Sequence, residues 1–324
     1  SDTQADDHFN TVLYSGNSSN GHGITGVGFQ PDWTWIKARS DTRTHVLYDS
    51  NRGAGKYLIS NSTNAEGTDT TAFASFDSDG FTVGTTENYI NNSSHTYVGW
   101  NWKANGGTTT TNDASSTGVG SIDSVIQANT TAGFSIVQYE ATGSAGTIAH
   151  GLSQAPTFMI VKSRDQNGTG WMVYYGDNTD YVTLNGNGAT IDGESTWNDT
   201  SPTSTVFSVG VNGGDTNNSS GGSMIGYIFH DVEGYSKFGS YTGNASADGT
   251  FIYTGFRPAW IMFKATVGGD WFIIDATRSP INEADDRLDA NESNAEKTSN
   301  ADIDFLSNGV KIREASANGI NQDT

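Results

Sequence analysis

The chain of 324 residues contains no cysteine. Disulfides are common in small secreted β domains, so their absence indicates assembly in a reducing cytoplasm or a lineage that is stabilised in another way. No apolar stretch approaches the roughly 20 residues that a membrane-spanning helix needs. Long runs of Ala, Leu, Glu and Lys with helical periodicity are missing as well, which argues against a helical fold.

Positive charge is scarce, because 16 Lys and Arg stand against 36 Asp and Glu and give a formal net charge of −20. Such a surface repels phosphate backbones and anionic lipids, so we expect neither nucleic acid nor a membrane as a partner. The acidity fits a protein that must stay soluble in a salty medium, or one that binds divalent cations. A solvated acidic surface is the simpler interpretation.

Hydrophobic residues are also few, at 34%, whereas 40 residues are Gly and 11% are aromatic. The aromatic content argues against a disordered chain. Many short strands joined by polar turns would explain both observations, because such a chain has a small aromatic core and many polar loop residues. The composition therefore predicts an all-β chain.

Only five prolines are present, and three of them occupy equivalent places in a repeated motif. In each copy a lysine follows the proline by six residues, across a run of aromatic and β-branched residues typical of a strand, and a tyrosine precedes the proline by 17 residues. The copies are residues 28–37, 154–162 and 255–264, with Pro31, Pro156 and Pro258, Lys37, Lys162 and Lys264, and Tyr14, Tyr139 and Tyr241. The chain therefore contains three copies of one structural unit.

Strand patterns repeat in the same order around each motif. We predict unit one at residues 1–103, a flexible linker rich in Gly, Thr, Asn and Ser at 104–120, unit two at 121–236 and unit three at 237–324. In each unit the tyrosine lies on an opening strand, and the lysine strand forms a hairpin with the next strand. The hairpin partners are residues 45–49, 171–175 and 271–275. Asp79-Gly80 and Asn308-Gly309 predict a second hairpin in units one and three.

Units one and two end with closing strands at residues 96–103 and 223–229, and Asn-Asn-Ser-Ser precedes both, at 91–94 and 217–220. In unit three, residues 318–324 stand where such a strand should begin. A missing strand leaves an unpaired sheet edge or an exposed core. We expect the native chain to continue beyond Thr324; the alternative is that another chain supplies the strand. The mass of the intact chain separates the two.

Asp77 and Asp79 resemble the start of a calcium-binding loop. That motif requires glycine at its sixth position and glutamate at its twelfth, and the chain has Thr82 and Asn88 there. A hairpin turn at Asp79-Gly80 explains the same residues. We therefore predict no metal site at this loop.

Other acids offer candidates for glycoside hydrolysis, which needs two carboxylates facing each other across a groove. Asp302 and Asp304 share one face of a predicted strand, and neighbours on one strand do not flank a substrate. Asp49 and Asp275 end matching strands of units one and three. We interpret these acids as turn caps and predict no catalytic residue and no cofactor.

The histidines have no metal-like spacing and are interpreted as ordinary loop or strand residues: His8, His22, His45, His95, His150 and His230. Tryptophans at equivalent strand positions are predicted to be core: Trp33, Trp35, Trp100, Trp102, Trp171, Trp260 and Trp271. Trp197 lies in a polar loop, so we expect it to be the exposed tryptophan, with a role in stacking on sugars as the less favoured alternative. The repeated lysines should lay their stems on the core and lead their ammonium groups to a turn carboxylate.

The three-unit order, with its motifs at residues 28–37, 76–84, 231–244 and 302–309, resembles the repeated β-rich region of uncharacterised structural proteins of marine tailed bacteriophages. The resemblance covers residues 9–323. It implies a virion component such as a tail fibre, an appendage or a capsid decoration, with other virion proteins as partners. It implies no catalytic residues.

We predict three antiparallel β-sandwich units arranged like beads, of jelly-roll or lectin-like topology by analogy. The leading hypothesis is a non-enzymatic virion surface protein, assembled in the host cytoplasm as a homo-oligomer, that contributes structure or host attachment. Repeated units suit attachment because weak contacts multiply into avidity. The alternatives are a carbohydrate-binding adhesin that recognises host-surface glycans and, more remotely, a glycan depolymerase. The binding residues of such a surface are not identified by the sequence.

Overall fold

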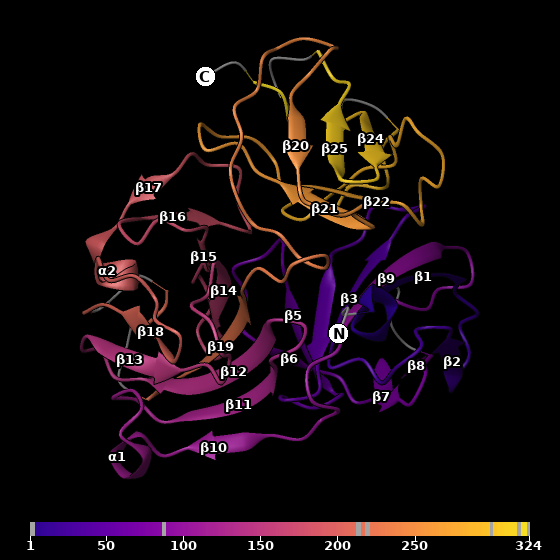
Figure 1. Ribbon diagram of the computed structural model, residues 1–324. Coiled ribbons are helices and arrows are strands. Elements are labelled where there is room, and N and C mark those ends of the chain that lie inside the picture. The colour runs from indigo at the N-terminus through magenta and orange to yellow at the C-terminus, as the bar shows by residue number, and fades with distance from the viewer. Residues whose placement is uncertain are drawn as a thin grey trace.

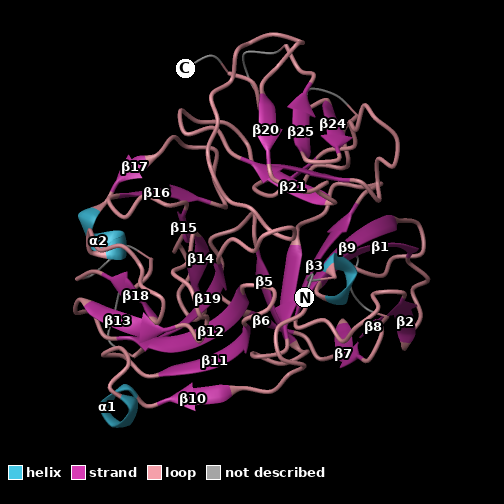
Figure 2. Ribbon diagram, viewed as in Figure 1, coloured by secondary structure: helices cyan, strands magenta, loops and turns pink. Residues whose placement is uncertain are grey.

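The computed structural model describes residues 4–85, 89–211, 215–217, 221–298, 301–315 and 319–322. Asn88, residues 218–220 of the second Asn-Asn-Ser-Ser run, and residues 318, 323 and 324 lie outside this part of the chain. Within it, antiparallel strands dominate, joined by loops and by short helices, a 3-10 turn at Ala5–Asp7, α1 at Ala114–Thr117 and α2 at Glu194–Trp197. Figure 2 shows that strands and loops make up almost all of the molecule. The prediction of an all-β chain with antiparallel β-sandwich units is confirmed.

Unit one is a sandwich of two antiparallel sheets, ordered β1-β9-β3-β4-β5-β6 and β2-β8-β7. Its strands are β1 (Phe9–Ser15), β2 (His22–Thr25), β3 (Trp33–Ala38), β4 (Val46–Asp49), β5 (Lys56–Ile59), β6 (Gly67–Thr68), β7 (Phe73–Asp77), β8 (Gly80–Val83) and β9 (Thr96–Trp102). The predicted hairpins β3–β4 and β7–β8 are confirmed. The predicted closing strand, β9, lies in the middle of the large sheet, between β1 and β3.

Unit two repeats this plan, with sheets ordered β10-β11-β12-β19-β14-β15-β16-β17 and β13-β18. Its strands are β10 (Thr110–Asn112), β11 (Ser124–Asn129), β12 (Phe134–Ala141), β13 (Gly146–Ala149), β14 (Phe158–Ser163), β15 (Trp171–Tyr174), β16 (Asp180–Thr183), β17 (Ile191–Asp192), β18 (Val206–Val209) and β19 (Gly222–Phe229). Here β19 is the counterpart of β9 and separates β12 from β14. Segment 104–120, for which composition predicts a flexible linker, contributes β10 and α1 to this unit.

Unit three has two small sheets, ordered β20-β25-β24 and β21-β22-β23. Its strands are β20 (Phe251–Tyr253), β21 (Trp260–Phe263), β22 (Phe272–Asp275), β23 (Leu288–Asp289), β24 (Ile303–Leu306) and β25 (Gly309–Ile312). The β24–β25 hairpin at Asn308-Gly309 is confirmed. The expected opening strand at 237–241 is wrong, because these residues form no strand. In the other units the opening strand is hydrogen-bonded to β9 or β19, and among the described residues unit three has no strand in that place.

The units form a triangle and not a row of beads, with unit three above units one and two in the view of Figure 1. In each unit, one face of the sheet that contains the lysine strand packs on the other sheet of the same unit and forms a separate core. The opposite faces meet in a single core that includes Trp33, Trp35, Trp100, Trp102, Phe134, Trp171, Tyr227, Phe229 and Trp271. Each inner face is too apolar to be left in water, so the three faces cover one another. This packing accounts for strands such as β3, in which every residue is buried.

Candidate functional site: the junctions between the units

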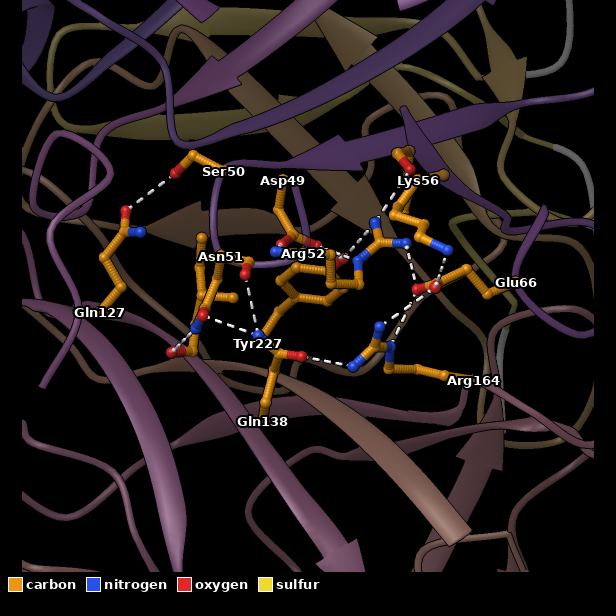
Figure 3. A network of polar contacts seen from close by, with 12 residues as sticks. Asp49, Ser50, Asn51, Arg52, Lys56, Glu66, Gln127, Gln138, Arg164 and Tyr227 are labelled. Carbon is orange, nitrogen blue, oxygen red and sulfur yellow. Dashed lines mark hydrogen bonds and ion pairs between the residues drawn. The ribbon is translucent and has the colours of Figure 1, made fainter. Parts of the chain in front are cut away.

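Units one and two meet at a buried network of charges, drawn in Figure 3. Asp49, at the end of β4, accepts hydrogen bonds from the backbone N–H of Arg52 (2.8 Å) and from Arg52 Nε. Arg52 Nη2 donates to the carbonyl of Leu47 at 3.1 Å. The phenol of Tyr227, on β19 of unit two, donates to Asp49 Oδ2 at 2.7 Å. Neither the Asp49 nor the Arg52 side chain is exposed, so this ion pair has left water entirely.

Glu66 extends the network to a second arginine. It accepts from Arg52 Nη1 at 3.2 Å, and Arg164 of unit two binds both of its oxygens, at 2.8 and 3.0 Å. The Glu66 backbone N–H also donates to the carbonyl of Arg164, at 2.6 Å. Burial alone would raise the pKa of Glu66, but the hydrogen bond from Arg164 and the charge of Arg52 lower it. Burial likewise opposes the charge on Arg52, and Asp49, Tyr227 and Glu66 together outweigh it and raise the Arg52 pKa.

Units one and three meet through the same arrangement of residue types. Asp275 Oδ2 pairs with Arg278 Nε at 2.6 Å, and Arg278 Nη1 donates to Glu296 at 3.0 Å. Arg39 of unit one binds both oxygens of Glu296, at 2.8 and 2.6 Å. Trp100 Nε1, on β9, donates to Asp275 Oδ2 at 3.0 Å. At both junctions, one unit thus supplies an aromatic donor and an arginine, and the neighbouring unit supplies an Asp–Arg–Glu set that binds them.

The third junction, between units two and three, keeps the contacts to backbone groups but, among the described residues, not the Asp–Arg–Glu network. Thr190 N donates to the carbonyl of Thr266 at 2.8 Å, as Glu66 does to Arg164 at the first junction. Trp271 Nε1 donates to the carbonyl of Thr183 at 2.8 Å, as Trp171 Nε1 does to Ile59 at 2.9 Å. The positions that hold Asp49, Arg52 and Glu66 in unit one hold Tyr175, Asn178 and Thr190 in unit two.

Two hollows lie at this third junction. The larger, of about 360 Å³, is lined by Tyr175 and Phe158 of unit two and by residues 237–241 and β21 of unit three. The second, of about 250 Å³, lies beside the shared core, where Trp33, Trp102 and Phe229 line it. Both are also lined by Phe158, Phe238, Ile261 and Met262, so they adjoin.

Within each unit, the repeated tyrosine and a buried asparagine fasten one loop. Each tyrosine hydroxyl donates to the carbonyl just before the asparagine, from Tyr14 to Ile90, from Tyr139 to Thr216 and from Tyr241 to Ile320. Each asparagine amide donates to a backbone carbonyl just after β8, β18 or β25, from Asn91 to Gly84, from Asn217 to Gly210 and from Asn321 to Glu314, at 2.7, 3.0 and 2.7 Å. The tyrosine that precedes each repeated proline by 17 residues therefore holds the same loop in every unit.

Several of the acids considered for a metal site or for catalysis have structural partners. Asp79 accepts from the backbone N–H groups of Gly26 (3.2 Å) and Gly28 (2.6 Å), and Asp77 accepts from Thr82 Oγ1 at 2.6 Å. Asp304 pairs with Arg313 at 2.7 Å. Partial burial, followed by the charge of nearby acids, raises the pKa of Asp302. The interpretation of Asp49 and Asp275 as turn caps is confirmed, since each accepts from a backbone N–H three residues later.

Expectations for the lysines and for Trp197 need correction. The lysine ammonium groups bind backbone carbonyls and a hydroxyl instead of a turn carboxylate: Lys37 contacts Ala38 O at 2.6 Å, Lys162 contacts Thr169 Oγ1 at 2.6 Å and Lys264 contacts Gly188 O at 2.8 Å. Trp197 is 1% exposed. Helix α2 turns its indole into the core of unit two, where it packs edge-on against Tyr174. The prediction that the other tryptophans are core is confirmed for all except Trp260, which is half-buried.

The sequence reading missed the arginines and glutamates of the junctions. A signal was present, because Asp49 and Asp275 are each followed three residues later by arginine, and Glu66 and Glu296 lie 14 and 18 residues beyond those arginines. Unit two does not carry this pattern, so the pattern cannot be recognised as a feature common to all three repeats. Within the described ranges, no group of three or more His, Asp or Glu side chains is placed to hold a metal ion. No helix in this part of the chain is long and apolar enough to cross a membrane.

The structure thus defines a class of protein, a triangle of three β-sandwich units closed around one aromatic core. The chain belongs to the family described as a domain of unknown function, DUF7483, whose model matches residues 4–323. No curated protein and no solved structure matches the chain.

Proposed function

We propose that this protein is a non-enzymatic structural component of a tailed-bacteriophage virion, exposed on the particle as part of a fibre, an appendage or a capsid decoration. The observation that carries the proposal is the shared core, in which three copies of one sandwich bury their aromatic faces together. Such packing gives a rigid block whose outer loops are free to contact other virion proteins or a host surface. The resemblance of the repeated motifs to marine phage structural proteins favours the same class.

The use of the ionisable groups supports a non-enzymatic role. Asp49 and Arg52, with Asp275 and Arg278, hold the units together and are not exposed. Asp304, a sequence candidate for an acid pair, has a structural ion-pair partner in Arg313. The net charge of −20 keeps such a block soluble at high local concentration.

Purified particles test the proposal. We expect mass spectrometry to find this protein in virions at a copy number that matches the particle symmetry, and antibody labelling to place it on the outside. Its absence from purified particles, with abundant protein in the same infected-cell lysate, would contradict the proposal. Release of oligosaccharides from host polysaccharide by the purified protein would contradict the non-enzymatic part.

A carbohydrate-binding adhesin is the second proposal, and two exposed aromatic side chains favour it. Phe251 and Tyr253 stand two residues apart on β20 and are 42% and 67% exposed. Residues i and i+2 of a strand share a face, so the two rings offer a platform of the kind that stacks on sugars. A glycan array should then show binding that Tyr253→Ala abolishes. The absence of any binding at millimolar sugar would remove this proposal.

A further inference from the structure

The lysine strand of unit three lacks a neighbour that its counterparts have. β3 pairs with β4 and β9, and β14 pairs with β15 and β19, whereas β21 pairs only with β22 among the described residues. The burial of the strands follows this pairing. All residues of β3 are buried, but Trp260, Ile261 and Met262 of β21 are only partly buried. The unpaired edge of β21 therefore presents backbone hydrogen-bonding groups and partly exposed apolar side chains.

A hollow lies along this edge. The cavity of about 360 Å³ has β21 on one side and residues 237–241 on the other. Residues 237–241 are the counterparts of the opening strands β1 and β12, which flank β9 and β19 in the other units. The hollow thus occupies the place that a central strand fills in units one and two. We call the space between 237–241 and β21 the strand slot.

The loop that precedes β9 in unit one has a counterpart at one end of the slot. Tyr241 and Asn321 fasten this loop as Tyr14 and Asn91 do in unit one. Gln322 and Ile320 line the hollow. These contacts hold the loop at this end of the slot as the equivalent contacts hold the loop of unit one.

We propose that the strand slot is a binding site for one extended peptide segment, which adds to β21 as an antiparallel strand and has the side-chain pattern of β9 and β19. The register follows from the complete units. Lys37 is opposite Val98, Trp35 opposite Trp100 and Trp33 opposite Trp102. Lys162 is opposite Ile225, Ile160 opposite Tyr227 and Phe158 opposite Phe229. The bound segment therefore carries an aliphatic residue opposite Lys264 and aromatic residues opposite Met262 and Trp260.

The aromatic residue of the segment that lies opposite Met262 would contact unit two. At the other junctions this residue is Tyr227 or Trp100, and it donates to Asp49 or Asp275. The matching position of unit two is Tyr175, whose side chain lines the slot. An aromatic ring here would complete the third side of the shared core, next to Trp271 and Phe158.

A glycine precedes that aromatic residue in both complete units, opposite Ile36 in unit one and Val161 in unit two. A Cβ at Gly99 would lie 3.3 Å from Phe81 Cζ and 3.4 Å from Val12 Cγ2, tighter than ordinary contact. Both complete units thus place glycine between an aliphatic and an aromatic residue, and the probe peptide keeps this order.

A capped synthetic peptide with the sequence of residues 95–103, His-Thr-Tyr-Val-Gly-Trp-Asn-Trp-Lys, is the direct probe. We expect saturable one-to-one binding to the full chain by calorimetry and a higher melting temperature in the presence of peptide. Hydrogen exchange should slow at residues 237–241 and 260–264. A scrambled peptide of the same composition should bind at least about tenfold more weakly, a difference of about 1.4 kcal/mol.

Variants of the protein assign the site. Met262→Lys places a charge on the slot wall and should abolish binding, whereas Ile281→Arg, at a residue that is 78% exposed and does not line either hollow, should leave it unchanged. The melting transition of each variant shows whether it is folded. If Met262→Lys does not fold, Tyr175→Ala serves as the second slot variant. Equal binding of native and scrambled peptide, protection away from the slot, or self-association of the protein through β21 that peptide does not displace would each overturn the proposal.

Discussion

The phenol of Tyr227 in unit two donates a 2.7 Å hydrogen bond to Asp49 Oδ2 in unit one, inside a junction from which water is excluded. The same carboxylate neutralises Arg52, whose side chain is also fully buried. One acid therefore satisfies both an arginine of its own unit and a hydroxyl of the neighbouring unit. A buried charge that loses its counter-charge is costly. Loss of the ion pair should therefore lower the stability more than loss of the tyrosine hydrogen bond.

Replacement of Asp49 by alanine should lower the free energy of unfolding by about 3–5 kcal/mol, because the buried Arg52 would lose its closest counter-charge and keep only the shared carboxylate of Glu66. Tyr227→Phe removes only a hydroxyl and should cost about 1–3 kcal/mol. Urea denaturation of the two variants and of the native protein measures both values. Asp248→Ala is the control, since Asp248 pairs with Lys311 but is 86% exposed, and it should leave the free energy of unfolding nearly unchanged. An Asp49→Ala variant as stable as this control would contradict the assigned role.

The asparagine fastening can be tested with a nearly isosteric change. Asn91 donates to Gly84 O at 2.7 Å and to Ser19 O at 3.0 Å, and it accepts from Asn17 N at 3.0 Å. Asn91→Asp keeps an acceptor for Asn17 but places a carboxylate against two carbonyl oxygens. We expect a loss of at least about 2 kcal/mol in the free energy of unfolding, measured by urea denaturation. Asn64→Asp, at an exposed side chain, is the matched control, and an equal effect of both changes would refute the fastening.

The repeated motif with Lys37 made the units and their hairpins predictable, because strand alternation and turn pairs such as Asp79-Gly80 are local properties of the sequence. The triangle was not predictable in this way. Alternation places Trp33 and Trp35 on one face of β3 and indicates that this face is buried, but it does not say what covers it. The covering side chains, such as Tyr227 and Phe134, come from another unit.

Trp197 illustrates a second limit. Its neighbours are polar, which is typical of an exposed loop, yet the single turn of α2 directs the indole inward. The junction residues show a third limit, since Asp49 and Arg52 recur as Asp275 and Arg278 but not in unit two. That departure coincides with the junction at which the strand slot lies open.

The buried lysine of unit one should make stability depend on pH. Burial lowers the pKa of Lys37 from 10.5 to about 7, against the opposing charges of Asp41 and Glu296. Between these two pH values the unfolded chain binds a proton that the folded chain does not, so the stability of the folded state rises with pH across this window. The contribution of Lys37 between pH 7 and pH 9 amounts to about 2 kcal/mol.

Lys37→Met should therefore reduce the gain in unfolding free energy between pH 7 and pH 9 by about that amount, measured by urea denaturation at both values. Part of the gain should persist, because burial also lowers the pKa values of Lys162 and Lys264, to about 8 in each case. Lys237→Met changes an exposed lysine and should leave the pH dependence as it is in the native protein. A Lys37→Met variant with the native pH dependence would show that Lys37 is not the group that titrates.

Asp32 should protect the connection between units one and two from proteolysis. Its carboxylate is buried and accepts from the backbone N–H groups of Ala104 (2.7 Å), Gly106 (2.9 Å) and Gly107 (2.7 Å). Asp32→Ala leaves three donors without an acceptor, and the loop can satisfy them only by opening to water. Trypsin, which cleaves after lysine, should then cut after Lys103 at least about tenfold faster, an opening free energy lower by about 1.4 kcal/mol. Asp113→Ala, which removes the cap of α1 further along the same segment, should leave that rate nearly unchanged. Gel analysis of the fragments separates a local effect from general unfolding, because faster cleavage at every lysine and arginine would contradict a role confined to this loop.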